Sequence, residues 1–424
     1  MANPERQLHR DYATAVEAVQ ILRVRPQTLY AYVSRGWIRS IFQKGHKDKL
    51  YLRADLTRVG MRSLARSGHG PVAASAMNWG EPIFPTSITE ITSLGPRYRG
   101  QLVADLVRDG TSFETVAELL WSGTLSNQRC EWPVPRASVE LVKLTRTMSA
   151  LQAADNILES FALAVLLLGL GRGAVADRLS GGKTLPAAKE IIQTMVACCG
   201  FAGPYGNYRP MLKSQSVVDG LIHALGVSPD VENFEALRAI LIVLADHELS
   251  PGTLSARVAA SAGGTLHSCI ASALCATSGR EVGRMYERVQ DFLGHAKTCS
   301  ALVSRARQLH ARGQTVPGFD HPLYPGGDPR AVQLLAIART RKLQDPELRA
   351  ALRFIDQMQI ESSIFPRQEL AVVILTRAMG LDRQVPAALF ALGRVAGWVA
   401  HVQEQRASGT LLRPRARFVK PAQG

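Results

Sequence analysis

The sequence predicts a mainly α-helical protein with a small, separate N-terminal domain. Hydrophobic residues make up 46% of the 424 residues and aromatic residues only 6%. The hydrophobic residues are dominated by Ala, Leu and Val, a composition that favours helix over sheet. From about residue 81 to Ala400, apolar helical stretches follow one another with short Gly/Pro breaks. We therefore divide the chain into a head (1–66), a linker rich in small residues (67–80) and a large helical domain (81–424).

Charge sets the N-terminal 66 residues apart. They contain 13 lysines and arginines against 5 aspartates and glutamates, so they carry +8 of the net charge of +15. This excess is compatible with a polyanionic partner or with anionic substrates, and a plain basic surface is the alternative.

Several classes of protein are disfavoured by the sequence. The six cysteines form no CxxC pair and have no His at metal-binding spacing, so we expect small core residues in a reducing compartment and no metal site. Met1–Arg10 is polar, unlike a signal peptide, and Phe161–Leu170 is too short to span a bilayer. We expect a cytoplasmic protein without a membrane segment.

The head is predicted to begin with two short helices. Thr14 and Glu17 form a capping box that starts a helix over 15–22. This helix is expected to bury Val16, Val19, Ile21 and Leu22. Pro26 suits the first turn of a second helix, 27–34. Two short helices joined by a tight turn indicate a helix-turn-helix.

Two β-like stretches, 37–42 and 49–52, follow these helices and flank the polar turn 43–48. Together with the pattern over 18–36, they resemble the winged helix-turn-helix of the mercury-resistance-regulator and excisionase type. That resemblance implies DNA binding. Groove contacts are assigned to Gln27, Thr28 and Tyr30, and phosphate contacts to Arg25, Arg35, Lys44, Lys47 and Lys49. The alternative is a head that packs on the next domain or mediates dimer contacts without binding DNA.

Two histidines are candidate site residues in the large domain. His247 ends an apolar helical stretch and has an acid on each side, whereas His321 lies in a Pro/Gly loop before Asp328-Pro329-Arg330. Imidazoles and guanidinium groups supply the donors that carboxylates need, which favours a pocket for a small polyanion. Spacing alone leaves the competing interpretation open, because a lone His near a helix end is often structural.

Several motifs of the large domain resemble bacterial citrate synthase. They lie at 98–100, 113–120, 244–261, 316–330 and 390–419 and keep the family order. The resemblance implies an almost all-α homodimer with a large domain and a small domain, roughly 280–385. It also implies condensation of oxaloacetate with acetyl-CoA or another short acyl-CoA as co-substrate, without a permanently bound cofactor.

Residue by residue, the resemblance implies that the oxaloacetate side is retained. His247 matches the dicarboxylate-binding His of the family, and His321 matches the His that polarises the ketone. The family's carboxylate-binding arginines correspond to Arg330, Arg394 and Arg413, the last supplied by the other subunit. Each guanidinium can hold a carboxylate with two hydrogen bonds.

The acyl-CoA side departs from the family. The family's enol-stabilising His aligns with Val282, and its catalytic Asp aligns with Glu369. Val282 has no hydrogen-bond donor, and loss of one oxyanion stabiliser typically costs about 10²–10³-fold in turnover. The extra methylene of Glu369 displaces its carboxylate. The sequence therefore favours an acyltransferase of the citrate synthase type with weak activity.

Three functions stay open at this point. The first is the condensing enzyme. The second is a DNA-binding regulator that senses oxaloacetate or citrate without turnover. The third is a non-catalytic subunit that forms a heterodimer with an intact paralogue and lends it Arg413.

Overall fold

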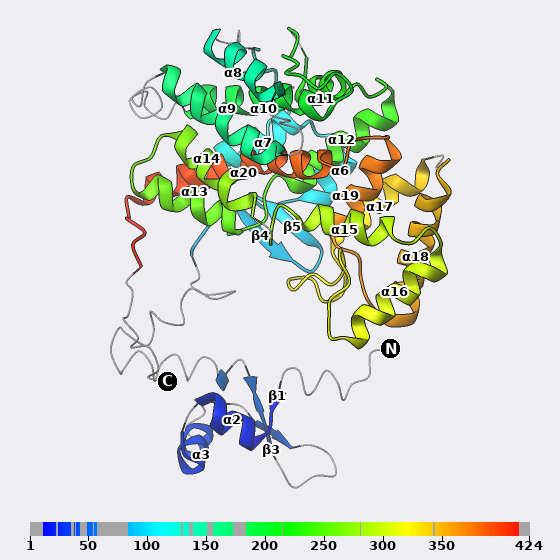
Figure 1. Ribbon diagram of the computed structural model, residues 1–424. Coiled ribbons are helices and arrows are strands. Elements are labelled where there is room, and N and C mark those ends of the chain that lie inside the picture. The colour runs from blue at the N-terminus through cyan, green and yellow to red at the C-terminus, as the bar shows by residue number, and fades with distance from the viewer. Residues whose placement is uncertain are drawn as a thin grey trace, which may run out of the picture. The chain divides into compact units, whose positions relative to one another are not determined.

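The computed structural model divides the chain into two compact units (Figure 1). One unit comprises residues 1–85 and 413–424, and the other comprises residues 86–412. The structure describes the following residues: 12–22, 24–34, 38, 40–42, 49–53, 55–56, 84–128, 130–134, 139–150, 156–172, 184–213, 215–279, 281–341 and 344–414.

The first unit contains two helices and a small antiparallel sheet. Its elements are β1 (Tyr12–Ala13), α2 (Ala15–Leu22), α3 (Pro26–Ser34), β2 (Ser40–Phe42) and β3 (Lys49–Leu52), with strand order β1-β3-β2. The expected helix 15–22 is confirmed, and so is its capping box. The Thr14 amide donates to Glu17 Oε2 at 3.0 Å, and the Glu17 amide donates to Thr14 Oγ1 at 3.3 Å.

The expected buried face of α2 is partly wrong. Ala18 and Leu22 are buried, whereas Val16 is 69% exposed and Ile21 is 43% exposed. Ala18 and Leu22 lie four residues apart on one face of the helix, and Val16 points to the opposite side. Hydrophobicity alone does not determine which face of so short a helix is buried.

The second unit is built almost entirely of helices, which confirms the mainly α prediction. The helices are α6 (Val103–Arg108), α7 (Phe113–Ser122), α8 (Val139–Ala150), α9 (Ile157–Arg172), α10 (Thr184–Cys198), η1 (Cys199–Ala202), α11 (Val217–Leu225), α12 (Val231–Leu244), α13 (Pro251–Ser261), α14 (Leu266–Thr277), α15 (Met285–Gly294), α16 (Cys299–Ala311), α17 (Pro329–Thr340), α18 (Pro346–Ser362), α19 (Gln368–Ala378) and α20 (Val385–Ser408). Many begin on side-chain caps, such as Ser112 before α7 and Asp328 before α17.

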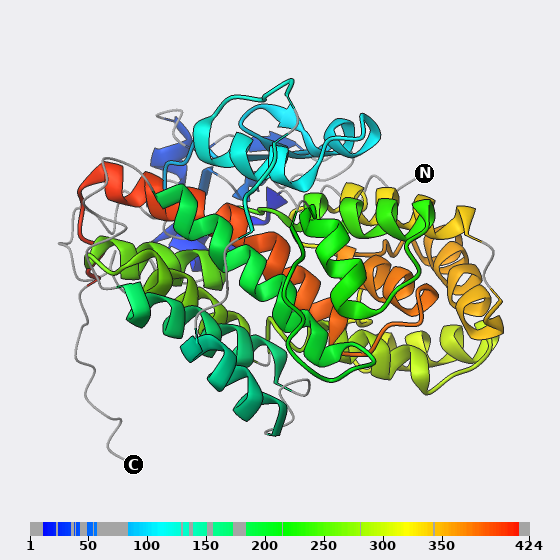
Figure 2. The same cartoon turned by 90° about the horizontal axis from the view of Figure 1, so that it is seen from above.

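Helix α20 forms the centre of this unit. It packs against α12, α13, α14 and α7, and Figure 2 shows it crossing the unit between the green helices. Among the described residues, it is the helix long and apolar enough to span a membrane, and its apolar window is completely buried. We therefore regard α20 as the core helix of a folded unit. Helices α15 to α19 lie together at one side of the unit (Figure 1).

A small sheet fixes the end of α12. Strands β4 (Thr89–Thr92), β5 (Gly95–Tyr98) and β6 (Gln101–Leu102) form an antiparallel sheet in that order. The buried hydroxyl of Tyr98 accepts the Asp246 N–H at 3.1 Å and lies 3.0 Å from the Ile242 carbonyl oxygen. Tyr98 therefore holds the chain immediately before His247.

The expectation for the cysteines needs a correction. Cys198, Cys199 and Cys269 are buried, as small core residues would be. Cys130 and Cys299 are half-buried, and Cys275 is exposed on α14. Cys275 is three residues before the α14 C-cap, and its position on the helix directs it away from the core faces.

Candidate functional site: a cluster of histidines and buried arginines

Four of the five predicted dicarboxylate-binding residues come from separate segments of the second unit. His247 follows the C-terminal end of α12, and His321 lies in the loop between α16 and α17. Arg330 is in the first turn of α17, and Arg394 is near the middle of α20. The C-terminal end of one helix, a loop and two other helices therefore supply these side chains.

The two imidazoles and a tyrosine form a compact aromatic cluster. The rings of His247 and His321 have centroids 5.3 Å apart and meet edge to face. Tyr324 lies 5.7 Å from the His247 ring and 5.1 Å from the His321 ring. Its hydroxyl is 3.0 Å from His247 Nε2. The predicted pair of histidines is thus side by side, with Tyr324 contacting both.

Burial and neighbouring positive charge keep both imidazoles neutral. Burial and then Arg330 lower the pKa of His321 from 6.5 to about 4. The pKa of His247 falls well below its usual range, first through burial and then through Arg330 and Arg394. The His321 Nδ1 accepts the Leu323 N–H at 3.1 Å. In a neutral ring this leaves the proton on Nε2, so His321 presents a hydrogen-bond donor.

Arg330 is held in a fixed position by Asp328. Nε and Nη2 of Arg330 donate to the two carboxylate oxygens at 3.0 and 2.9 Å, and both side chains are buried. Asp328 also accepts the backbone N–H groups of Arg330 and Gln368. Burial opposes ionisation of Asp328, but Arg330 and these donors lower its pKa. The bonds to Asp328 do not use Nη1 of Arg330.

Arg394 is also buried. Although it is far from His247 in the sequence, it contacts the end of α12, the helix that precedes His247. Its Nε donates to the Leu244 carbonyl oxygen at 2.8 Å, and its guanidinium lies 4.9 Å from the centre of the Phe390 ring. Burial lowers its pKa. Arg413, the fifth predicted residue, is exposed and follows the last residue of this unit.

Strained backbone flanks both histidines. Glu248 has φ of 55° and Asp320 has φ of 54°, so each histidine has a left-handed, non-glycine neighbour. Such conformations cost on the order of 1–3 kcal/mol and gather at functional sites. The strained residues directly follow His247 and directly precede His321.

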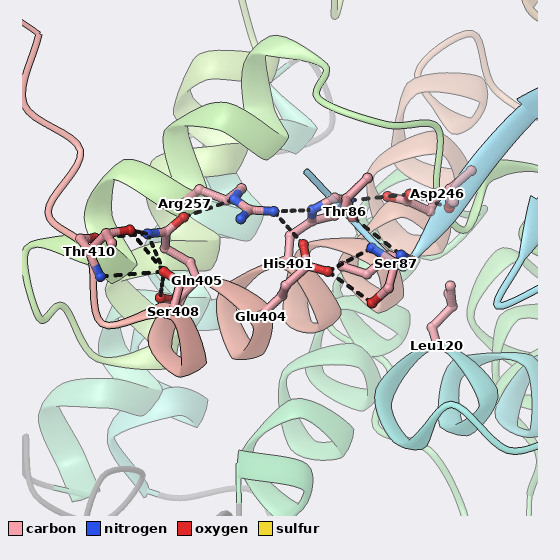
Figure 3. A network of polar contacts seen from close by, with 12 residues as sticks. Thr86, Ser87, Leu120, Asp246, Arg257, His401, Glu404, Gln405, Ser408 and Thr410 are labelled. Carbon is pink, nitrogen blue, oxygen red and sulfur yellow. Dashed lines mark hydrogen bonds and ion pairs between the residues drawn. The ribbon is translucent and has the colours of Figure 1, made fainter. Parts of the chain in front are cut away.

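A polar network includes Asp246, the residue that precedes His247 in the sequence (Figure 3). Asp246 Oδ2 accepts the Thr89 hydroxyl at 2.6 Å and lies 3.4 Å from His401 Nε2. Arg257 Nη1 is 3.2 Å from His401 Nδ1 and 2.6 Å from Glu404 Oε2. Because a guanidinium only donates, His401 Nδ1 accepts and its Nε2–H faces Asp246. The network ties the residue before His247 to α13 and α20.

The two predicted acyl-side residues have different surroundings. Val282 is half-buried in a turn, where its N–H donates to the Gly279 carbonyl oxygen at 3.1 Å. Glu369 is buried in the first turn of α19, and Arg367 holds its carboxylate through bonds of 2.8 and 3.1 Å. Among the described residues, no group of three or more His, Cys, Asp or Glu could hold a metal ion.

Two contributors to the site were missed by sequence reasoning. Tyr324 lies only three residues after His321, and an aromatic residue so near a candidate His was an available signal. The pairing of Arg367 with Glu369 had no comparable signal, because residues two apart do not normally face each other on a helix.

The predicted DNA-binding residues fall on the first unit. Of the groove-facing set, Gln27 is exposed, Tyr30 is 56% exposed and Thr28 is half-buried on α3. Of the phosphate-contacting set, Arg25 and Lys49 are exposed. The remaining three, Arg35, Lys44 and Lys47, lie outside the described residues.

Solved structures define the fold of the helical unit. It is similar to citrate synthase from Pyrobaculum aerophilum, with 22% identity and a TM-score of 0.68 over 80% of this chain and 91% of that one. It is also similar to citrate synthase from Thermoplasma acidophilum, solved as a ternary complex with carboxymethyl coenzyme A and oxaloacetate. That match has 24% identity and a TM-score of 0.65 over 81% of this chain and 96% of that one. The unit therefore has the citrate synthase fold.

Sequence comparison agrees with the fold. Residues 77–415 match the family described as "Citrate synthase, C-terminal domain", so the chain belongs to the citrate synthase family. It is 25% identical to citrate synthase 2 of Bacillus subtilis, covering 79% of this chain and 93% of that protein. It is 24% identical to 2-methylcitrate synthase of Shewanella oneidensis, covering 78% and 91%. The resemblance seen in the motifs is confirmed at the level of the family.

Proposed function

We propose that the helical unit binds oxaloacetate, or a similar dicarboxylate, and condenses it with acetyl-CoA or another short acyl-CoA. The acyl group would become an alkyl group on transfer. The observation that carries the proposal is the cluster that half-buried His247 and His321 form with buried Arg330 and Arg394. Family membership and the relatives named citrate synthase and 2-methylcitrate synthase support it.

The cluster suits a keto-dicarboxylate chemically. Two buried guanidinium groups provide fixed positive charge for the carboxylates, at low cost of ordering because Asp328 and Leu244 already hold them. The Nε2–H of neutral His321 is a donor for a ketone oxygen, on which negative charge develops when a carbanion attacks the carbonyl carbon. Arg413 of a second copy would complete the set of cations in a homodimer.

Ligand stabilisation tests this proposal directly. A ligand that binds only the native protein adds about 2.7 kcal/mol to its stability when the ligand concentration is 100 Kd. Its melting temperature therefore rises. Oxaloacetate and citrate should therefore stabilise the protein, and monocarboxylates such as acetate should not. Arg394→Gln should abolish the effect. A protein whose melting temperature is unchanged by saturating oxaloacetate would not contain the proposed pocket.

Turnover is expected to be slow, because the acyl side lacks the family His. Val282 offers no donor to the thioester oxygen, a deficit of about 10²–10³-fold. Release of free CoA in the presence of oxaloacetate measures the rate. Val282→His should raise it, with Val142→His on α8 as a control for adding an imidazole elsewhere. Acetyl-CoA and propionyl-CoA assayed in parallel identify the preferred acyl group.

A second candidate function is a DNA-binding regulator that senses a dicarboxylate. The exposed Gln27 and Tyr30 on α3, followed by the β2–β3 hairpin, favour it. The test is a titration with duplex DNA at several salt concentrations, because each phosphate contact adds about −0.9 to the slope of log K against log[salt]. Tyr30→Ala should weaken binding. A chain that binds no DNA even at low salt would leave the head as a packing or dimerisation module.

A further inference from the structure

Arg367 and Glu369 form an ion pair at the acyl side of the candidate site. Arg367 Nε lies 3.1 Å from Glu369 Oε2, and Nη2 lies 2.8 Å from Oε1. Glu369 is 4% exposed and Arg367 is 23% exposed. The pair uses Nε and Nη2, whereas Nη1 takes part in neither of these bonds.

The backbone fixes this pair beside the loop that carries His321. The Arg367 N–H donates to the Gly318 carbonyl oxygen at 2.8 Å, and Phe319 pairs with Pro366 in an antiparallel bridge. The Asp320 N–H donates to the Phe365 carbonyl oxygen at 2.9 Å. The chain entering His321 and the chain entering Glu369 therefore run side by side. This backbone pairing places Arg367 and Glu369 beside the loop that carries His321.

The pair also contacts the segment that contains Val282. Arg367 Nη2 lies 3.8 Å from Sδ of Met285, three residues after Val282. Tyr286 donates its hydroxyl hydrogen to Gln368 Oε1 at 3.2 Å. The charge of Arg367 acts on both site histidines, whose pKa values fall through burial first and through Arg330 and Arg367 among the nearby cations. Arg367 thus lies between the acyl-side turn and the histidine cluster.

We propose that Arg367 is a further catalytic residue of the condensation. Its guanidinium donates from Nη1 to the thioester carbonyl oxygen, the role for which Val282 has no donor, while Glu369 accepts the α-proton. This inference rests on the proposed condensing function. It assigns to Arg367 of this chain the donor role that Val282 cannot fill.

The proton transfer is balanced within this pair. The α-carbon loses a proton to a Glu369 oxygen, its C–H electron pair becomes the C=C bond of an enolate, and the carbonyl π pair moves to oxygen. The negative charge therefore leaves the carboxylate and appears on the enolate oxygen. Arg367 loses its ion-pair partner at the same moment, so its cation is available for the new anion without reorganisation. The enolate carbon then attacks the ketone carbon, whose π pair moves to the oxygen that faces the Nε2–H of His321. Water then hydrolyses the thioester of the product, which breaks the C–S bond and releases CoA.

Deuterium incorporation into the acetyl group of acetyl-CoA in D₂O, with oxaloacetate present, tests the inference together with the release of CoA. Arg367→Gln should lower both rates by about 10²–10³-fold, the usual effect of removing one oxyanion donor. Arg367→Lys keeps the charge and should retain part of the rate. Arg377→Gln is the matched control, because Arg377 lies on the same helix and pairs with Asp345 and Glu347 instead.

A second-site variant separates a donor from a structural residue. If Arg367 and an imidazole at 282 act on the same oxygen, then Val282→His should recover turnover in the Arg367→Gln background. Stabilisation by oxaloacetate should be equal in the wild type and in Arg367→Gln, since the dicarboxylate side is intact. Recovery with equal stabilisation supports catalysis by Arg367.

The results that would contradict the role of Arg367 differ from those that would contradict the proposed function. Turnover of Arg367→Gln at or above the wild-type rate would mean that the pair restrains Glu369, and it would overturn the inference. Wild-type protein that is stabilised by oxaloacetate but incorporates no deuterium would also overturn it, while leaving the dicarboxylate pocket in place. If oxaloacetate does not stabilise the wild-type protein, the proposed function itself is wrong.

Discussion

The neutral state of His321 makes a quantitative prediction about stability and pH. The pKa of this residue falls from 6.5 to about 4 in the folded protein, because the ring is half-buried and lies near Arg330. Between these two values the unfolded chain binds more protons at this position than the folded chain. Stability therefore falls as the pH decreases through the window, and the penalty is nearly absent above pH 7.

The size of the effect follows from the two pKa values. Proton linkage for one such group gives a loss of about 2 kcal/mol between pH 7 and pH 5, and of about 3 kcal/mol by pH 4. Replacing His321 with Gln removes the titration and keeps a side chain of similar volume. The free energy of unfolding of His321→Gln, relative to the wild type, should therefore rise by about 2 kcal/mol on going from pH 7 to pH 5.

Urea unfolding of both proteins at the two pH values provides the measurement. His310→Gln serves as the control for the loss of an imidazole elsewhere, because His310 is an exposed residue of α16. Equal pH dependence of the wild type and His321→Gln would refute the assignment of a neutral, half-buried imidazole.

Three further substitutions test the packing around the site. Asp328→Asn removes the negative partner of buried Arg330 and should cost about 3–5 kcal/mol in urea unfolding, as broken buried ion pairs do. Gly397→Ala places a Cβ 2.2 Å from Asp246 Oδ1, so we expect a loss of about 1–3 kcal/mol from overpacking and a lower melting temperature. Tyr98→Phe leaves the Asp246 N–H without its hydroxyl acceptor and should cost about 1–3 kcal/mol, with weaker stabilisation by oxaloacetate. A change below about 0.5 kcal/mol, the range of ordinary surface substitutions, would contradict each of these structural assignments.

Local sequence signals predicted the local structure of the head well. The capping box at Thr14 and Glu17 and the start at Pro26 placed two helices correctly, because capping depends on residues close together in the chain. The buried face of α2 was only partly predicted. An eight-residue helix has apolar residues on more than one side, so its contacts with the rest of the unit decide which side is buried.

The sequence by itself determined the mainly helical class, the family and the identity of the residues to examine around His247 and His321. Only the tertiary structure decided that Tyr324 contacts both imidazoles and that Asp328 fixes Arg330. It also decided that Glu369 is paired. Arg367 is the N-cap residue of α19 and has an extended backbone, with φ −97° and ψ 165°, so its side chain turns toward the first helical turn. Sequence spacing does not reveal this conformation, because it is accompanied by a hydrogen bond from the Arg367 N–H to Gly318, which is distant in the chain.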